Sequence, residues 1–174
     1  MTRGVVNRDK ENALSLERVK SLLDYDPATG VFRWRVARYG SPPGKVAGTV
    51  RKNNEYIVIW IDGSLFMAHR LAWFYATGEW PYPYIDHANC DRKDNRFENL
   101  RVATRAQNTM NTKNRNRSSS GVRGVYWSHQ NNKWIAYITI NSIFSYLGQF
   151  DDLDEATRVR AHAERKCYGE FARA

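Results

Sequence analysis

The sequence predicts a protein of the α+β class, built from two small units in which short antiparallel strands are combined with helices. Runs rich in β-branched and aromatic residues, such as EYIVIWI at 55–61 and KWIAYITI at 133–140, are typical of strands. Turn residues such as DG and NN separate these runs at short intervals. The stretch 112–120 holds no apolar residue and divides the 174-residue chain, which is long enough for two modest cores.

The first unit is expected to begin with one short amphipathic helix. Leucine and valine recur at helical spacing in LSLERVKSLL at 14–23, and Asp26-Pro27 is expected to stop this helix. Residues 1–12 are polar and show no periodicity, so no element is predicted there.

A small antiparallel sheet is predicted over residues 30–67. VFRWRV, KVAGTV, EYIVIWI and SLFMA supply its strands, and KNN and DG supply its turns. The spacing of apolar residues then becomes helical in AHRLAWFYATG at 68–78, which predicts a helix with Gly78 as its C-terminal cap.

The next segment reads as strand, loop, strand and helix. YIDH at 84–87 and LRVA at 100–103 predict two short strands around a polar loop. Thr104 and Gln107 have the spacing of a capping box, so a helix is expected to begin near Arg105 and run toward Asn114. We place the first domain at 1–111 and a basic linker at 112–120.

The last domain is expected at 121–174, with three strands and one helix. GVRGVYW, KWIAYITI and IFSYLGQF predict the strands. Asp152 and Glu155 can cap the helix, and Gly169 can end it. Its apolar stripe is predicted to consist of Ala156, Val159, Ala163 and Cys167.

Charge points to a polyanionic partner. The net charge is +9 and the pI is about 9.7, with basic residues spread along the chain and interleaved with aromatic ones. Nucleic acid therefore fits better than a membrane surface, because no basic amphipathic helix stands out. A soluble basic protein with no such partner is the alternative that composition leaves open.

Cysteine usage and hydropathy restrict the class further. Cys90 and Cys167 lie far apart and outside any CxxC pair, which excludes a Cys-rich zinc site and fits a reduced compartment. The N-terminus has no apolar signal region, and no apolar run reaches the roughly 18 residues that a spanning helix requires. We expect a cytoplasmic protein that does not enter a membrane.

One segment carries a chemical motif. IDHANCDRKDNRFENLRVATRAQN at 85–108 holds an Asp-His pair, an Asn twelve residues after the His, and a further Asn nine residues on. This segment resembles the His-Me finger of HNH endonucleases, most closely the phage homing-type branch. The similarity covers residues 22–115 and includes LLDYDPATGVFRWR, KVAGTV and AHRLAWFYATGEWP. It implies a ββα-metal nuclease core that hydrolyses phosphodiester bonds in double-stranded DNA, as a nick or a double-strand break.

The residue types of the motif suit that chemistry. His87 is the candidate general base, because an imidazole with a pKa of about 6.5 is mostly neutral in the cell and can take a proton from water. Asp86 and Asn108 offer hard oxygen ligands for one Mg²⁺, or another divalent ion such as Mn²⁺. The resemblance implies that Asn99 binds loop backbone and holds His87 in place. Because neighbours in a regular strand face opposite ways, Asp86 and His87 are expected where the strand ends or twists.

Other polar residues near the motif leave alternatives open. Asn95 competes with Asn99, and the ENLR context favours Asn99, whereas the DRKDN loop favours a turn role for Asn95. His69 precedes a helix in a context that the family shares, but such a histidine more often packs or hydrogen-bonds locally. His129 and His162 are expected to be structural or exposed.

Basic residues around the motif are candidates for phosphate contacts, with a purely solvated surface as the alternative. The candidates are Arg70, Arg92, Lys93, Arg96, Arg101 and Arg105, followed in the linker by Lys113, Arg115 and Arg117.

Residues 121–171 resemble the DNA-binding domain of the plant ethylene-response-factor (APETALA) type, through RGVYW, KWIAYI, YLGQFD and DEATRVRAHA. That resemblance implies a three-stranded sheet in the major groove with a helix behind it. Alternation places Ala136, Ile138 and Ile140 toward the helix. The implied base-reading positions are Arg123, Tyr126, Ser128, Tyr137, Thr139, Phe144 and Tyr146. Most arginines of the plant reading face are replaced here, and exposed aromatic residues could instead pack against the first unit.

Together these patterns predict a monomeric, site-directed homing-type DNA endonuclease, in the cytoplasm of a bacterial host if a phage encodes it. A restriction-like or weakly specific HNH nuclease is the nearest alternative. A non-cutting DNA-binding protein is the alternative of another class, and the intact set of Asp86, His87, Asn99 and Asn108 argues against it.

Overall fold

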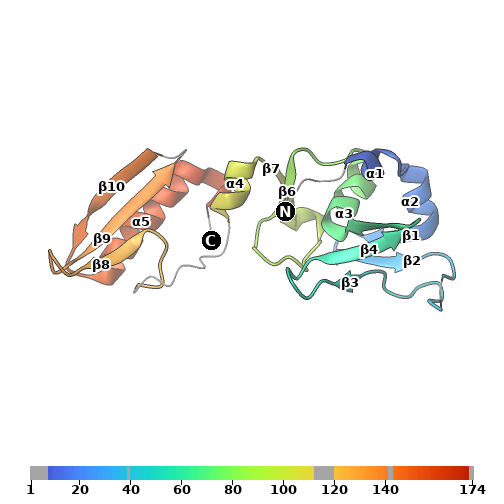
Figure 1. Ribbon diagram of the computed structural model, residues 1–174, viewed down its shortest axis with the longest axis horizontal. Helices are drawn as coiled ribbons and strands as arrows, with labels where there is room; N and C mark the ends of the chain where they lie inside the picture. Colours follow the sequence, from blue (N-terminus) through green and yellow to red (C-terminus); the bar gives the residue numbers. More distant parts are fainter. Residues whose placement is uncertain (1–7, 39, 112–119, 141–142, 173–174) are drawn as a thin grey trace. The chain divides into compact units, whose positions relative to one another are not determined.

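The computed structural model describes residues 8–38, 40–111, 120–140 and 143–172, and it forms two compact units, 1–103 and 104–174 (Figure 1). Both units combine helices with small antiparallel sheets, which confirms the mixed composition predicted from the sequence. Most of the predicted linker lies at 112–119, outside the described residues. No helix in the described part of the chain has the length and apolar character needed to cross a bilayer.

The first unit begins with two helices, α1 (Arg8–Asn12) and α2 (Leu16–Leu22). Helix α1 lies where the sequence shows no periodicity. Helix α2 starts at Ser15, whose hydroxyl accepts a hydrogen bond from the Arg18 N–H at 3.2 Å. It ends before the predicted Asp26-Pro27 stop, because the next four residues pair as a strand instead.

Two separate sheets replace the single predicted sheet over 30–67. One holds β1 (Leu23–Asp26) and β2 (Val31–Trp34), and the other has the order β3 (Thr49–Val50), β4 (Ile57–Ile61) and β5 (Ser64–Met67). Only the end of KVAGTV forms a strand. Gly48 has φ of 101°, and a Cβ there would lie 2.9 Å from the Ile57 side chain, so the chain bends before β3.

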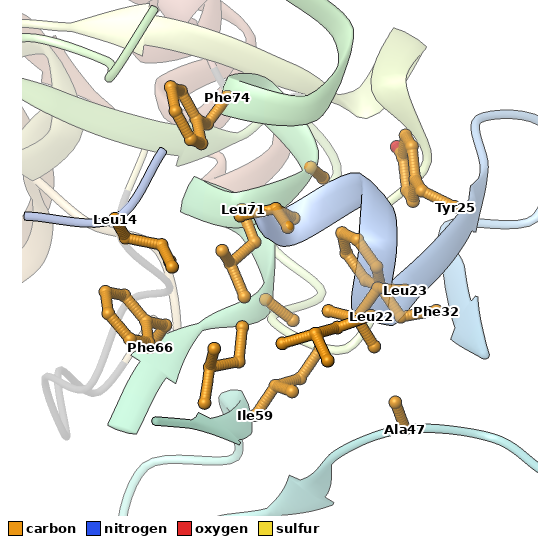
Figure 2. Close-up of a cluster of buried hydrophobic side chains, with 14 of the residues drawn as sticks. Leu14, Leu22, Leu23, Tyr25, Phe32, Ala47, Ile59, Phe66, Leu71 and Phe74 are labelled. Atoms are coloured by element: carbon orange, nitrogen blue, oxygen red, sulfur yellow. The ribbon is translucent and has the colours of Figure 1, made fainter. Parts of the chain in front are cut away.

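Helix α3 (Ala68–Thr77) ends as predicted, with Gly78 in the left-handed conformation at φ of 80° and its N–H bonded to the Phe74 carbonyl. Its buried face meets side chains from α2, β1, β2, β4 and β5 in one apolar cluster (Figure 2). Leu23, Ile59 and Leu71 are fully buried in this cluster. The core therefore fixes α3, the helix that carries His69 and Arg70.

The motif segment follows the predicted order of elements. Strands β6 (Tyr84–His87) and β7 (Leu100–Ala103) pair antiparallel, with Asp86 opposite Arg101 and His87 opposite Leu100. The loop between them ends in a short 3₁₀ turn, η1 (Phe97–Asn99). This arrangement places both ends of the loop next to His87.

The second unit begins with α4 (Arg105–Met110), and the predicted capping box is present. The Thr104 N–H donates to the Gln107 side chain at 2.8 Å, and the Gln107 N–H donates to the Thr104 hydroxyl at 3.2 Å. The helix ends at Met110, before the predicted Asn114.

The rest of this unit is a three-stranded sheet packed on one helix. Strand β9 (Lys133–Ile140) lies between β8 (Val125–Ser128) and β10 (Ile143–Phe150), and α5 (Leu153–Tyr168) packs against it (Figure 1). Asp152 caps α5 as predicted. A second 3₁₀ turn, η2 (Gly169–Phe171), follows α5.

The helix-facing side chains are predicted only in part. Ala136, Ile138 and Ala156 are buried as expected. Cys167, placed in the apolar stripe by the sequence, is exposed, and Tyr168 is buried in its place. The aromatic ring fills more of the gap beneath the sheet than a thiol can, and its hydroxyl donates to the Thr139 carbonyl at 3.3 Å.

Candidate active site

His87 lies at the end of a strand, where the sequence analysis expects the Asp86-His87 pair. It is the last residue of β6, and its carbonyl accepts a turn hydrogen bond from the Cys90 N–H at 2.9 Å. Both Asp86 and His87 are buried. The site thus has a buried carboxylate and a buried imidazole on neighbouring residues.

The His87 ring is bound by Asn95, the residue that sequence reasoning set aside. The His87 Nε2 and Asn95 Oδ1 are 3.2 Å apart, and Asn95 is 1% exposed. The Asn95 Nδ2 donates to the Lys93 carbonyl at 3.4 Å, which turns Oδ1 toward the ring. In the tautomer that donates from Nε2 to the Asn95 Oδ1, Nδ1 is the basic nitrogen of neutral His87.

Asn99 binds loop backbone, the kind of contact expected of it. Its Oδ1 accepts from the Asn89 N–H at 3.0 Å, and its Nδ2 donates to the Asp94 carbonyl at 2.8 Å. Its own carbonyl accepts from the Ala88 N–H at 2.9 Å. Asn99 therefore ties the start of the loop to its end, while Asn95 binds the imidazole itself.

Asp94 organises the loop, and sequence reasoning missed it. Its carboxylate accepts hydrogen bonds from the Arg96 side chain at 2.8 and 2.9 Å and from the Asn89 amide at 2.7 Å. The Arg96 bond is the largest of several that hold the pKa of Asp94 at about 2, so the group is charged at neutral pH. The sequence does carry a signal for this loop, because the Asn and Asp residues of NCDRKDN favour Asx turns. In one such turn, the Lys93 N–H donates to the Asp91 carboxylate.

The β1–β2 hairpin anchors this loop from outside the motif. The Tyr25 hydroxyl donates to the Asn95 carbonyl at 2.8 Å, and the Phe97 N–H donates to the Pro27 carbonyl at 3.0 Å. Gly30 has φ of 73°, and a Cβ there would lie 2.4 Å from the Arg96 nitrogen. Only glycine permits so close an approach of the two backbones.

Asp86 is paired with Arg101 on the opposite strand. The Arg101 Nε and Nη2 donate to Asp86 Oδ2 at 2.9 and 2.8 Å. Among the described residues, no three His, Cys, Asp or Glu side chains gather into a group that could hold a metal ion. The predicted centre uses one carboxylate and one amide, and these hard oxygen donors fit Mg²⁺ or Mn²⁺.

Asn108, the second predicted ligand, lies on α4 in the second unit. Its N–H donates to the Thr104 carbonyl at 3.0 Å, and its side chain is half-buried. The pairing of Asn108 with Asp86 stays a prediction.

One buried histidine, His69, lies against the candidate base His87. Burial lowers the pKa of His87, against the opposing effects of Asn95 and Asp86, so the neutral form is favoured at neutral pH. His69 is also buried, and burial followed by repulsion from His87 holds its pKa well below the ordinary value. Neutral imidazoles suit proton acceptance.

The basic residues near the motif differ in their surroundings. Arg70 is buried, binds the Glu11 carboxylate at 2.6 and 2.8 Å and also donates to the Pro81 carbonyl, which does not favour the phosphate contact expected of it. Arg92 covers the Tyr56 ring at 5.0 Å, and Lys93 lies 3.5 Å from Glu55. Arg105 is exposed. Lys113, Arg115 and Arg117 lie outside the described residues.

Six of the seven predicted reading positions share one face of the second sheet, opposite α5. Tyr126, Phe144 and Tyr146 are 43%, 61% and 56% exposed. The Tyr137 ring contacts Tyr126 at 6.0 Å edge-on and stacks on Phe144 at 5.1 Å. Ser128 and Thr139 join this face by register, and Arg123 is part-buried ahead of β8.

The motif segment lies within a part of the chain that matches a known family. Residues 66–110 match the family model described as HNH endonuclease, so the chain contains a nuclease domain of that class. Protein 3.8 of Escherichia phage T7 is 29% identical over 106 residues, which is 60% of this chain and 87% of that protein. The HNH part of the predicted resemblance is confirmed. The comparisons give no support to the ethylene-response-factor resemblance predicted for 121–171.

Proposed function

We propose that the protein is a divalent-metal-dependent endonuclease of the homing HNH type that hydrolyses phosphodiester bonds in double-stranded DNA. The observation that carries this proposal is a buried, neutral His87 whose Nε2 meets Asn95, beside the Asp86 carboxylate and inside the HNH match. The chain is proposed to act as a monomer in the cytoplasm of a bacterial host.

Each residue has a defined task in this proposal. His87 takes a proton from the attacking water at Nδ1 and later returns it to the departing oxygen. Asn95 holds Nε2 and keeps the basic nitrogen the same throughout, while Asn99 keeps the loop closed. Asp86 and Asn108 would hold one Mg²⁺ or Mn²⁺, which when bound supplies positive charge at the reacting phosphate. Arg101, whose Nη2 lies 2.8 Å from Asp86 Oδ2, adds a further positive charge beside Asp86.

A plasmid assay tests the activity. Supercoiled DNA incubated with the protein and Mg²⁺ or Mn²⁺ is expected to become nicked or linear, and EDTA is expected to stop the reaction. Sequencing the ends produced from a random-site library distinguishes a homing-type enzyme, with one long site, from a weakly specific nuclease. Binding without cleavage under every metal condition would show a non-cutting DNA-binding protein.

Asn95 gives a specific prediction for this centre. Asn95→Ala removes the acceptor at His87 Nε2, so we expect kcat to fall about 10- to 100-fold, the usual effect of losing a partner of this kind. Asn95→Asp keeps an oxygen acceptor and is expected to retain more activity than the alanine variant. Single-turnover cleavage measures the rate of each variant, and filter binding measures its affinity for DNA. Unchanged kcat for folded Asn95→Ala would rule out the role of Asn95.

We further propose that the exposed aromatic face of the second unit contacts DNA. Aromatic rings and hydroxyls on one face of a sheet can pack against and hydrogen-bond to base edges in a groove. The double variant Tyr137→Ser/Phe144→Ser is expected to bind the target about 10-fold or more weakly, since each lost base contact costs about 1–3 kcal/mol. Cleavage at saturating DNA should change little. Trp60→Ser, which alters a 51%-exposed aromatic residue of the first unit, is the control, and equal losses in both variants would contradict the proposal.

A further inference from the structure

Three aromatic rings from separate parts of the first unit meet at the base, and we name them the Tyr56–His69–His87 ring cluster. The His69 ring on α3 lies 5.0 Å from the His87 ring at 74°, so it meets that ring edge to face. The Tyr56 ring lies 5.1 Å from His69 and 5.9 Å from His87. His69 is 7% exposed, and the packing of α3 on the core holds it there.

Hydrogen bonding does not explain why a histidine occupies this position. Among the residues that the structure describes, the buried His69 Nδ1 has no hydrogen-bond partner, which destabilises the folded chain relative to an apolar side chain of similar size. In the described part of the chain, the His69 side chain makes ring contacts with Tyr56 and His87. Stability alone therefore gives no reason for His69, whereas its place against His87 does.

The contact with His69 restrains the His87 ring in a way that the hydrogen bond to Asn95 does not. A hydrogen bond at Nε2 fixes one atom of the ring, and the outer side-chain torsion of histidine has a broad range of allowed values. A rigid ring set edge-on against the imidazole blocks rotation about that torsion. A flexible aliphatic side chain in the same place would change its own conformation and allow the His87 ring to rotate.

We infer that His69 is a positioning residue of the nuclease centre, whose ring, supported by Tyr56, keeps the His87 imidazole in the orientation that meets Asn95. This inference rests on the proposed function, in which His87 is the base. It assigns His69 no contact with DNA and no proton transfer. The shape of its ring is what acts, so a phenyl ring should replace it and an aliphatic chain should not.

Two substitutions in the full-length protein separate ring shape from polarity. We expect His69→Leu to lower kcat about 10-fold or more with little change in KM, because misorientation of the base affects the chemical step. We expect His69→Phe to stay within about threefold of wild type. Both variants should unfold at or above the wild-type temperature, since each removes an unpartnered buried nitrogen. Phe74→Leu, on the same helix but stacked on Trp80, is the control for general destabilisation.

A spectroscopic readout shows whether the effect passes through His87. Nitrogen-15 NMR of the histidine rings should show His87 as the Nε2–H tautomer in wild type and in His69→Phe, and a mixture of tautomers in His69→Leu. Folded His69→Leu with wild-type kcat and an unchanged His87 signal would overturn the inference. Loss of activity in both variants would also overturn it, because a nitrogen would then be required. Full cleavage by His87→Ala would instead overturn the proposed function, so the two failures differ.

Discussion

His87→Ala is expected to cleave DNA about 10²- to 10⁴-fold more slowly than wild type, the usual effect of removing a general base. Without the imidazole, water must lose its proton unaided, while the groups that contact phosphate stay in place. DNA binding should therefore change little. Removing a buried side chain from the end of β6 leaves the Asn95 amide without its partner, and a modest loss of thermal stability is expected.

The measurement is single-turnover cleavage with saturating protein, sensitive enough to follow a rate 10⁴-fold below wild type. His129→Ala, an exposed histidine of the second unit, is the matched control and should cut normally. Circular dichroism confirms that each variant is folded. Cleavage by His87→Ala at the wild-type rate would remove His87 from the mechanism.

Asp86→Ala should have the second largest effect. Charge stabilisation by a bound metal is worth several kcal/mol, which corresponds to about 10²- to 10³-fold in rate if its carboxylate ligand is lost. The substitution also removes the carboxylate that Arg101 binds. The Arg101 side chain is only 18% exposed, so its charge would then lie beside an apolar side chain. We therefore expect weaker metal dependence together with reduced stability.

A titration with Mg²⁺ or Mn²⁺ separates these effects. Asp86→Asn keeps the size of the side chain and an oxygen donor, so it should fold better than the alanine variant and need more metal for half-maximal rate. Asn108→Ala should shift the same titration, and Asn108→Asp keeps a ligand while adding charge. If Asp86→Ala cuts normally at the wild-type metal concentration, Asp86 is not a ligand.

Local signals predicted the motif segment well. Strands β6 and β7 were expected at YIDH and LRVA, and the start of α4 followed from the Thr104–Gln107 capping box. Strand β1 was missed because LLDYD continues the helical spacing of the residues before it. Its structure is decided by pairing with β2, and that pairing depends on the turn and the core rather than on the composition of the segment.

Sequence spacing singled out those candidate residues that lie near one another in the chain. The Asp86-His87 pair and the loop contacts of Asn99 lie within fifteen residues of one another. The roles of Asn95 and Asp94 depend on which way their side chains turn inside an Asx-rich loop, and spacing does not reveal that. Tyr56 and His69 reach His87 only through the fold of the first unit, and Arg70 is drawn inward by Glu11, 59 residues earlier.

Because Tyr25, Pro27 and Gly30 anchor the loop, the motif segment cannot be moved to another protein without them. The family match begins at residue 66, yet the backbone that carries Asn95 is shaped by a hairpin more than sixty residues away in sequence. A peptide or graft limited to the matched segment would carry the candidate residues Asp86, His87 and Asn108 and lack the hairpin that shapes the loop. The working unit is therefore larger than the segment by which such proteins are recognised, and transplanting the chemistry into another protein means taking the hairpin with it.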